Sequence, residues 1–535
     1  MLVRFAVCVA VAVSASAVFG QPAEKPKALP ELHAEQALRD ARCSLHNEDT
    51  KFQLQRGVRV PISAGGFVDH VVFPSDTKDA DLWKLLPHVA KLTRLTCVDL
   101  TGCKNVTAQG LKKLQTLPKV EVLVLDDTMV NAAGLKELAG VKGLRHLELS
   151  GTPLTDPDFK ALAGLQQLQS LVIHGMPKMT AAGLRNILDV QQIQHLDVAW
   201  KNAVNADVTQ TIGRAKFLLS LRIAPVTDDD LAEIGKIPVL INLDLGNDQQ
   251  FGQDRKGRLS NRITTDGMNK LAGCKSLRSL DVSFNSATGE ELQDFLKIDS
   301  LEEIYLRGSS WSDKGVAKLG TMPTLRVVDL RETKVRDKAM EDLADLPRLQ
   351  RLYLAGTALT DSGLQKLTRL RTLQVLDLSS TNVSCARVPD MKNFTQLEHL
   401  HLAGTRVSIA SFTELSSIKS LRFLNLLDNM PDITSDNAQP LNNDLPKCMI
   451  IASKESGEGY YSWPGSRYFT FYVPPVRSNQ PPVISVPVVK VPVISVPVVN
   501  VPVIAVPNNN VVTRINPPAP PPIRVGPAVA VPAAR

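Results

Sequence analysis

The sequence repeats one leucine-rich pattern at intervals of about 24 residues. The pattern, L-x-x-L-x-L-x-x-T, starts at Leu95, Val120, Leu144, Leu168, Ile193, Leu218, Leu240, Leu277, Leu301, Leu325, Leu349, Leu373, Leu397 and Leu421. A unit this short cannot bury its own apolar residues, so neighbouring units must stack and share one continuous core. The repeat therefore predicts a long, curved solenoid with a large open surface.

Each repeat reads as a short strand followed by a short helix. In residues 349–372, Leu352 and Leu354 alternate with polar neighbours, which is the periodicity of a strand. Thr360 then stands where its side chain can cap the free N–H groups of a helix, and Asp361 favours the positive end of the helix dipole. The same helix start recurs at Thr227, Thr265 and Ser312, each followed by aspartate.

These residues resemble the leucine-rich repeat family, in its ribonuclease-inhibitor-like or cysteine-containing variety, over about residues 68–430. The resemblance implies an α/β solenoid with parallel strands on the concave face and short helices on the convex face. The chain also resembles exported bacterial proteins with T-D-x-G-L repeats. Where the family often has asparagine after the last strand leucine, this sequence has Cys103, Thr128, Thr152, Asn285, Ser309, Thr333, Thr357, Thr381 and Thr405. We expect these small polar groups to bond the turn backbone, which makes Cys103 a turn residue and not a catalytic or metal-binding thiol.

Two departures from the repeat predict irregular structure. Met176, Lys201, Val226 and Asp248 depart from this pattern of small polar turn residues, so repeats four to seven should be the least regular. The step from Leu240 to Leu277 is 37 residues, and the excess lies near the polar segment 246–262. We expect this segment to be a loop at the strand end. It is either a binding loop or a tolerated surface insertion.

The sequence predicts five parts. Residues 1–20 are typical of a secretory signal, with Arg4 before an apolar stretch and small residues. A linker, an N-terminal cap and a degenerate repeat occupy 21–94, and the repeats occupy 95–430. Residues 431–472 form a C-terminal cap with an aromatic cluster, and 473–535 form a disordered, extended Pro/Val-rich tail. No later segment is apolar over a membrane-spanning length, so we expect an exported chain with no transmembrane segment.

The charge and the cysteines exclude several classes of function. One unit of the net charge of +7 is Arg4 and five lie in the tail, which leaves +1 for residues 21–472. A nucleic-acid-binding surface is therefore not expected. The cysteines lack C-x-x-C spacing, although Cys43–Cys97 or Cys385–Cys448 pairing stays open. We expect no enzyme and no cofactor, since no catalytic motif is present.

The register of the strands predicts which side chains line the concave face. The central positions are Asp99, Val124, Glu148, Val172, Asp197, Arg222, Asp244, Asp281, Tyr305, Asp329, Tyr353, Asp377, His401 and Asn425, and seven of them are acidic. Rungs about 4.8 Å apart let these charges sum, which favours a cationic partner. Arg307, Arg331 and Arg351 border the row. The alternative is that aspartate here only keeps the strands soluble.

The predicted binding residues are Asp197, Asp244, Asp281, Tyr305, Asp329, Tyr353, Asp377, His399 and His401. His399 and His401 share one side of a strand near Asp377, which raises a metal site as an alternative, but we expect none because an open face seldom supplies a closed ligand set. Protonation of the concave histidines below about pH 6.5 should weaken the negative field.

The sequence therefore predicts an exported protein-binding module with a cationic protein partner. Two alternatives remain. The tail could attach a structural protein to the cell envelope, or the aromatic residues of 460–472 could bind carbohydrate.

Overall fold

The computed structural model describes residues 29–46, 68–176, 178–190, 193–199, 206–246, 262–385, 390–429, 433, 437–453, 459–462 and 472–473. The chain divides into two compact units, 1–482 and 483–535, and every described residue lies in the first. The expected signal, most of the insertion, most of the aromatic cluster and nearly all of the tail lie outside the described residues. The predicted domain boundaries therefore stay predictions.

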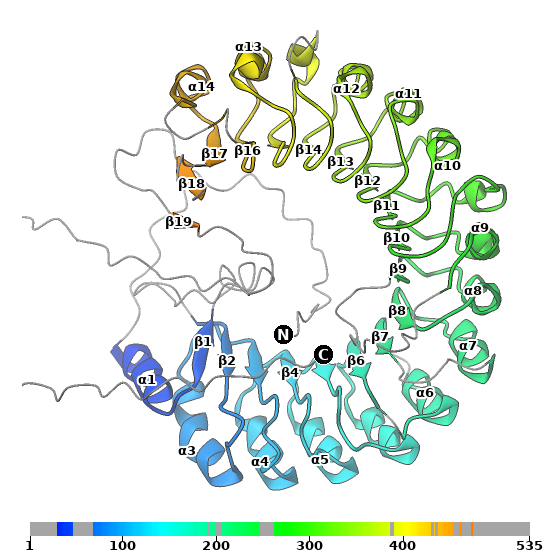
Figure 1. Cartoon of the computed structure of the whole chain (residues 1–535). Coiled ribbons are helices and arrows are strands. Elements are labelled where there is room, and N and C mark those ends of the chain that lie inside the picture. Colours follow the sequence, from blue (N-terminus) through cyan, green and yellow to red (C-terminus); the bar gives the residue numbers. More distant parts are fainter. Residues whose placement is uncertain are drawn as a thin grey trace, which may run out of the picture. The chain divides into compact units, whose positions relative to one another are not determined.

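Parallel strands line the inner side of the first unit, as Figure 1 shows. From β2 to β17 each strand pairs in parallel with the next in the chain, while β1 pairs antiparallel with β2, and β17, β18 and β19 pair antiparallel. The strands are β1 Ser44–His46, β2 His70–Val72, β3 Cys97–Asp99, β4 Val122–Val124, β5 His146–Glu148, β6 Ser170–His174, β7 His195–Ala199, β8 Ser220–Ala224, β9 Asn242–Asp244, β10 Ser279–Asp281, β11 Glu303–Tyr305, β12 Val327–Asp329, β13 Arg351–Tyr353, β14 Val375–Asp377, β15 His399–His401, β16 Phe423–Leu426, β17 Met449–Ser453, β18 Gly459–Ser462 and β19 Tyr472–Val473.

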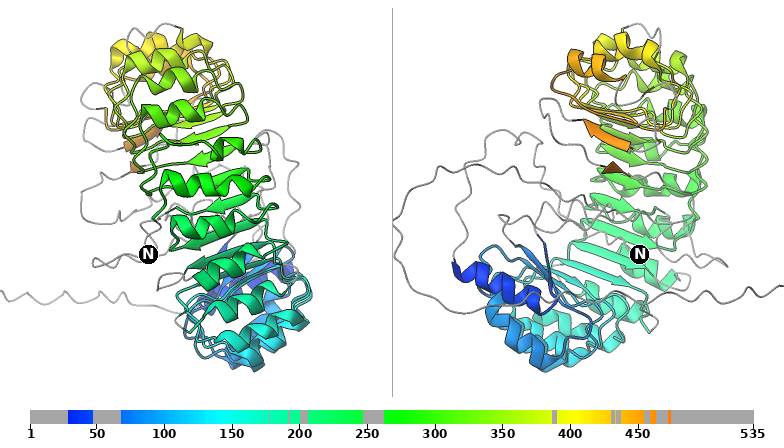
Figure 2. Two further views of the ribbon diagram at one scale, coloured as in Figure 1. Left: turned by 90° about the vertical axis from the view of Figure 1, so that its right-hand side faces the viewer. Right: turned by 60° about the vertical axis from the view of Figure 1, so that its left-hand side comes forward.

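Short helices form the outer layer (Figures 1 and 2). The α-helices are α1 Leu29–Asp40, α3 Asp79–Val89, α4 Ala108–Lys113, α5 Ala132–Glu137, α6 Ala181–Leu188, α7 Ala206–Gly213, α8 Asp228–Ile234, α9 Thr265–Lys270, α10 Asp313–Leu319, α11 Ala339–Leu343, α12 Asp361–Leu367, α13 Phe412–Ser416 and α14 Gln439–Asp444. The 3₁₀ helices are η1 Leu114–Thr116, η2 Leu138–Gly140, η3 Asp156–Gly164, η4 Leu271–Gly273, η5 Phe295–Lys297, η6 Met391–Asn393 and η7 Ile409–Ser411. None of these helices combines the length and the apolar character needed to cross a membrane.

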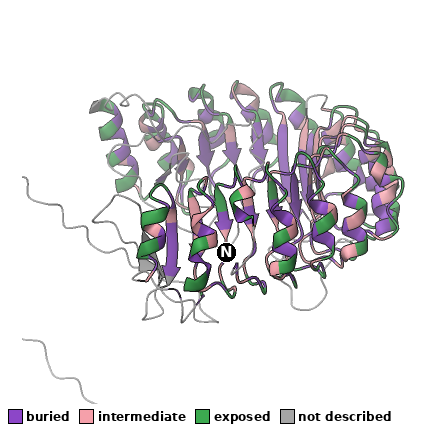
Figure 3. Cartoon of the chain, turned by 90° about the horizontal axis from the view of Figure 1, so that it is seen from above, coloured by how far each residue is buried: buried purple, intermediate pink, exposed green. Residues whose placement is uncertain are grey.

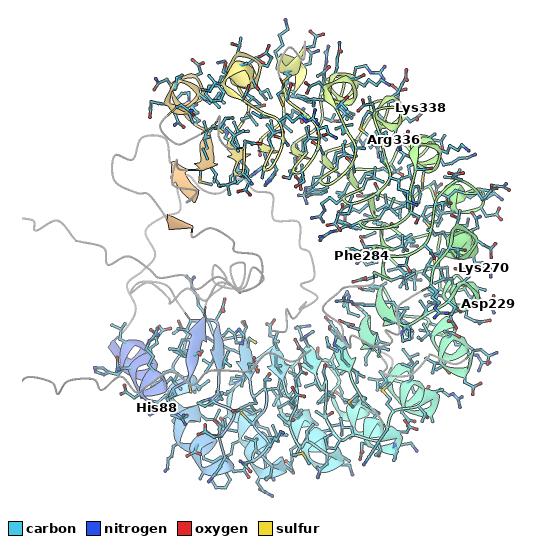
Figure 4. The ribbon with its side chains drawn as sticks, in the orientation of Figure 1. His88, Asp229, Lys270, Phe284, Arg336 and Lys338 are labelled. Carbon is cyan, nitrogen blue, oxygen red and sulfur yellow. The ribbon has the colours of Figure 1, made fainter. Side chains whose placement is uncertain are left out.

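The core is one continuous apolar layer between the strands and the helices, and Figure 3 shows the buried residues concentrated in the strands. Leu352 and Leu354 are fully buried, and so are Leu364 and Leu367 of the facing helix α12. The outer helical side carries ion pairs such as Asp229–Lys270, at 3.1 Å between Oδ1 and Nζ (Figure 4). The predicted α/β solenoid is thus confirmed.

A cap-to-aspartate contact joins some repeats to the repeat before them, as at Thr360. Thr360 donates its N–H to Asp337 Oδ1 at 2.8 Å and its hydroxyl to Oδ2 at 2.5 Å. Its Oγ1 also accepts the N–H of Ser362, which caps helix α12. Gly363 lies against the same carboxylate, since a Cβ there would be 2.5 Å from Asp337 Oδ1. The aspartate therefore does more than complement its own helix dipole, because it also holds the cap of the following helix.

The same contact recurs along the stack. Aspartate carboxylates accept the N–H and hydroxyl of the next cap residue in the pairs Asp79–Thr107, Asp156–Thr180, Asp228–Thr264 and Asp361–Ser384. The carboxylate oxygens accept both cap donors at these partly exposed junctions, so each pair links two neighbouring repeats.

The polar turn residues bond backbone carbonyls, as expected, but in two different ways. Thr357 donates its hydroxyl to Leu354 O at 2.7 Å within its own turn. Asn429 bridges two turns, because its Nδ2 donates to Leu402 O at 2.8 Å and its Oδ1 accepts the N–H of Thr405 at 2.7 Å. Threonine thus shapes one turn, whereas asparagine ties neighbouring turns together.

Three of the four repeats that depart from the small polar turn residue have longer strands, and in the fourth, β9 has three residues. Strands β6, β7 and β8 each span five residues, and their pairing continues past the central position, as in Ile173 with Val198 and Val198 with Ile223. Without a turn residue to bend the chain, the backbone continues in the sheet. The irregularity expected for this part of the stack takes this form.

No disulfide joins any of the six described cysteines, all of which are buried, so neither Cys43–Cys97 nor Cys385–Cys448 is formed. Cys103 donates its thiol to Pro74 O at 3.2 Å, which fits its expected place in a turn. Burial raises the pKa of Cys103 to about 11 and of Cys43 to about 12. Such thiols carry little nucleophilic thiolate at neutral pH.

Candidate protein-binding face

Two rows of side chains line the inner face, because alternate residues of a strand point to the same side of the sheet. The entry row holds the first residue of each strand, and the central row holds the third. The register aligns the central row as Asp99, Val124, Glu148, Val172, Asp197, Arg222, Asp244, Asp281, Tyr305, Asp329, Tyr353, Asp377, His401 and Asn425. Eight of the nine predicted binding residues lie in this row, and His399 lies in the entry row.

The central aspartates fold the backbone at the strand end. Asp281 Oδ1 accepts the N–H of Ser283 at 2.8 Å, and Asp377 Oδ1 accepts the N–H of Ser379 at 3.0 Å. Asn425 makes the same bond to Leu427 at 3.1 Å. Because a neutral amide does this equally well, the backbone accounts for a short polar acceptor at these positions but not for the repeated choice of a charged one.

Asp329 is sealed beneath an arginine of its own repeat. Arg331 donates Nε–H to both carboxylate oxygens, at 2.9 and 3.0 Å, and its Nη2 bonds Oδ2 at 2.5 Å. The guanidinium also lies over the ring of Tyr353, 5.3 Å from the centroid. The Asp329 side chain consequently keeps only 2% of its surface exposed, so its charge is neutralised and covered.

Asp281 and Tyr305 form a second acid–aromatic pair two strands earlier. They are in register on β10 and β11, and both remain partly exposed. Tyr305 donates its hydroxyl to Glu303 Oε2 at 3.1 Å, and Ser279 donates to the same oxygen at 3.2 Å. Burial, and then the Glu303 carboxylate, raise the pKa of Tyr305, so the hydroxyl keeps its proton. Glu303, an entry-row residue that the sequence analysis did not single out, is thereby held in place.

Asp244 and Asp197 are paired with cations or donors. Arg222 Nε lies 3.2 Å from Asp244 Oδ2, and His174 Nε2 lies 2.7 Å from Asp197 Oδ1. Burial raises the pKa of Asp244 to about 7, Asp281 adds to the rise, and Arg222 opposes it. The Asp244 side chain is 39% exposed, so water screens part of this effect.

The two C-terminal histidines of the predicted set pack on an aromatic ring. The centroid of Phe423 lies 5.8 Å from that of His399 and 5.1 Å from that of His401. Burial lowers the pKa of His399, so this residue gains its proton below the pH of about 6.5 assumed from the sequence. No group of three metal-binding side chains suited to an ion occurs among the residues that the structure describes.

The sequence places His146, His174 and His195 on the concave face, and on β5–β7 these histidines lie in a histidine–carboxylate network whose contacts the sequence did not predict. His146 Nδ1 lies 2.7 Å from Ser170 Oγ, and its Nε2 lies 3.2 Å from Glu148 Oε1. Burial, and then His146, lower the pKa of His195. The entry row would have revealed this cluster, because His146, Ser170 and His195 stand at its consecutive positions.

Comparison with known proteins agrees with this architecture. Residues 76–302 match a family model described as a leucine-rich repeat region. Within these residues the inner face is the strand face of a leucine-rich repeat region. The same parallel strand pairing continues beyond the matched residues, through β17. No curated protein matches the chain.

Several solved leucine-rich repeat structures are similar at low identity. An internalin from Listeria monocytogenes is 18% identical over 68% of this chain and 82% of its own, with a TM-score of 0.32. A leucine-rich repeat protein from Leptospira interrogans is 18% identical over 68% of this chain and 91% of its own, with a TM-score of 0.35. TLR13, solved in complex with ssRNA13, is 16% identical over 69% of this chain and 64% of its own, with a TM-score of 0.42. None of these likenesses identifies a partner for this chain.

Proposed function

We propose that this chain is an exported, non-enzymatic protein that binds a protein partner through its inner face. The observation that carries the proposal is the central row from β10 to β14, where tyrosines alternate with aspartates in exact register beside arginines. Tyrosine and arginine are enriched among the residues that contribute most to protein interfaces. The stacked strands hold these side chains in place, which lowers the entropy cost of binding.

The charges favour a partner with cationic groups, at particular places along the row. Arg222 and Arg331 neutralise Asp244 and Asp329. Among the described residues, no lysine, arginine or histidine lies within ion-pair distance of Asp281, Glu303 or Asp377, and all three stay partly exposed. The attraction therefore concentrates on β10–β11 and on β14 and is not uniform along the row.

The finer parts of the proposal depend on the sequence. Residues 1–20 support export to the periplasm, the envelope or the exterior, and the T-D-x-G-L repeats support the ribonuclease-inhibitor-like variety and a likeness to exported bacterial proteins. Envelope attachment by the tail and carbohydrate binding by residues 460–472 are the alternatives that the sequence raised. No contact among the described residues favours either one.

The test is affinity capture from envelope and secreted fractions with the full chain as bait. A bait with Asp281→Asn and Asp377→Asn removes two charges but keeps the amide oxygens that accept the Ser283 and Ser379 N–H groups. Asp329 is unsuitable for charge reversal, because lysine there would face Arg331 in a covered position. We expect the double variant to fold normally, to bind the captured protein more weakly and to lose part of the salt dependence.

A matched control neutralises two acids of the outer layer. Glu341→Gln and Asp345→Asn remove the same charge at side chains that are 66% and 70% exposed, in α11 and just after it. Capture should survive this change. Equal capture by all three baits would place the interface elsewhere, and no specific capture by the native chain would contradict the proposed function.

A further inference from the structure

The repeat symmetry places the same acid–aromatic pair on the inner face twice. Asp329 of β12 is in register with Tyr353 of β13, and Asp281 of β10 is in register with Tyr305 of β11. The residue two positions after each aspartate also occupies equivalent places. It is Arg331 in the first pair and Ser283 in the second. The contacts of Asp329 and Tyr353 therefore indicate which chemical group Asp281 and Tyr305 can bind.

The first pair holds a guanidinium group. Arg331 bonds both carboxylate oxygens of Asp329 and lies over the Tyr353 ring, at 5.3 Å from the centroid. This arrangement uses the planar shape of the guanidinium twice, once for the two-oxygen contact and once for stacking. The chain itself thus provides a bound arginine in an Asp–Tyr site.

The second pair lacks such an arginine and is more acidic. Ser283 offers Asp281 a backbone N–H but no cation. Glu303, fixed by Ser279 and Tyr305, stands at the entry-row position that Arg351 occupies beside Tyr353. Two carboxylates therefore stand beside Tyr305, where the first pair has one carboxylate and two arginines.

The neighbouring arginines are engaged elsewhere. Arg222 lies 3.2 Å from Asp244. Arg307 pairs with Glu332 at 2.6 Å and lies over the ring of Phe284, 5.3 Å from its centroid. Phe284 is on the inner side of the stack, where Figure 4 labels it. Among the described residues, no guanidinium has the relation to Asp281 and Tyr305 that Arg331 has to Asp329 and Tyr353.

We propose that Asp281, Glu303 and Tyr305 receive an arginine side chain of the partner protein. The two carboxylates would accept its N–H groups while the Tyr305 ring stacks against its plane, as Tyr353 does for Arg331. Lysine would gain the charge but not the two-oxygen contact or the stacking. This inference rests on the proposed function, since it names the group that the inner face recognises.

The experiment uses a fluorescein-labelled tetra-arginine peptide, with tetra-lysine and tetra-citrulline as matched probes. Binding to the full chain is followed by anisotropy at low ionic strength. Tetra-arginine should bind most tightly, tetra-lysine more weakly and tetra-citrulline least. Ser283→Arg supplies an internal arginine in the place of Arg331 and should weaken tetra-arginine binding by about tenfold. Arg331→Ser uncovers Asp329 and should strengthen binding.

The control is Ser362→Arg, which adds the same charge to exposed Ser362 on the outer helix α12. It should change tetra-arginine binding little. Equal binding of arginine and lysine, with Ser283→Arg acting no more strongly than Ser362→Arg, would show only a general acidic field and overturn the inference. Absence of binding by any probe would overturn it too. If Ser283→Arg still captures the partner while the Asp281→Asn/Asp377→Asn bait does not, the inference fails and the proposed function stands.

Discussion

The contact between Gly363 and Asp337 predicts a specific coupling between two repeats. A Cβ added at Gly363 would lie 2.5 Å from Asp337 Oδ1 and 2.4 Å from Leu359 Cδ1. The carboxylate cannot simply turn away, because Thr360 holds both of its oxygens. Gly363→Ala should therefore destabilise the protein, although alanine normally favours a helix over glycine.

The magnitude follows from opposing effects. With contacts of 2.4 and 2.5 Å, overpacking at Gly363 should cost about 2–3 kcal/mol, and the helix preference of alanine returns about 1 kcal/mol, so the net loss for Gly363→Ala is about 1–2 kcal/mol. Asp337→Ala removes two charge-assisted hydrogen bonds from the cap of α12, one of them 2.8 Å long, and should cost about 2 kcal/mol in this partly exposed site. In the double variant the clash with the Asp337 carboxylate is gone, and the contact with Leu359 remains. Its loss should be smaller than the sum of the single losses by about 1 kcal/mol.

Urea denaturation of the native chain, the two single variants and the double variant, followed by far-ultraviolet circular dichroism, measures this coupling. Stacked repeats can unfold in parts, so the fluorescence of Trp311, fully buried at the start of the α10 repeat, provides a local probe as well. Additive losses within about 0.3 kcal/mol would refute the idea that this glycine exists to admit the carboxylate. A Gly363→Ala variant as stable as the native chain would refute it more directly.

Three further predictions concern the core, the turns and the inner face. Leu352→Asp places an unpaired charge in the fully buried layer and should lower stability by more than about 4 kcal/mol in thermal unfolding; a melting curve like that of the native chain would contradict the register. Asn429→Ala breaks a bridge between two turns and should lower the free energy of unfolding by about 2 kcal/mol. Thr357→Val should lower it by only about 0.5–1 kcal/mol, because Leu354 O still accepts the Thr357 N–H. Equal losses in urea titrations would argue against the distinction between the two residues. The pKa of Asp244 is raised to about 7, which means that folding favours the protonated carboxyl. The stability that the folded chain gains from this carboxyl is fully present below about pH 4 and is lost as the pH rises through about 7. The native chain should therefore lose stability relative to Asp244→Asn by about 1 kcal/mol over that window, after screening at this half-exposed site, and a flat difference across the window would show that the carboxyl is not strained.

The sequence predicts the solenoid and the row of inner residues because both depend on periodicity alone. A 24-residue step sets the strand stacking, and alternation within L-x-L sets which side chains share a face. The structure accordingly aligns Asp281 with Tyr305 and Asp329 with Tyr353. Which residues of the row are available to a partner does not follow from periodicity.

Availability depends on side-chain contacts that a single repeat does not specify. Asp329 and Asp281 have the same place in the pattern, but only the first is covered, because Arg331 folds back on it. The polar turn residues give a second example. Threonine and asparagine fit one position in the pattern, yet Asn429 reaches the neighbouring turn and Thr357 does not. These differences arise from reach and from the identity of residues one repeat away.

The aspartate-to-cap contact also makes the number of repeats easy to change. At five junctions a repeat presents a carboxylate to the hydroxyl residue that caps the next helix. Removing residues 349–372 as a block would bring Asp337 opposite Ser384, which already makes this contact with Asp361. The junction would keep its chemistry, and the inner face would lose one rung that includes Tyr353. Duplication of a block would lengthen the face in the same way. A chain built like this can acquire a longer or shorter binding surface through whole-repeat gain or loss, while point substitutions on the inner rows adjust what that surface recognises.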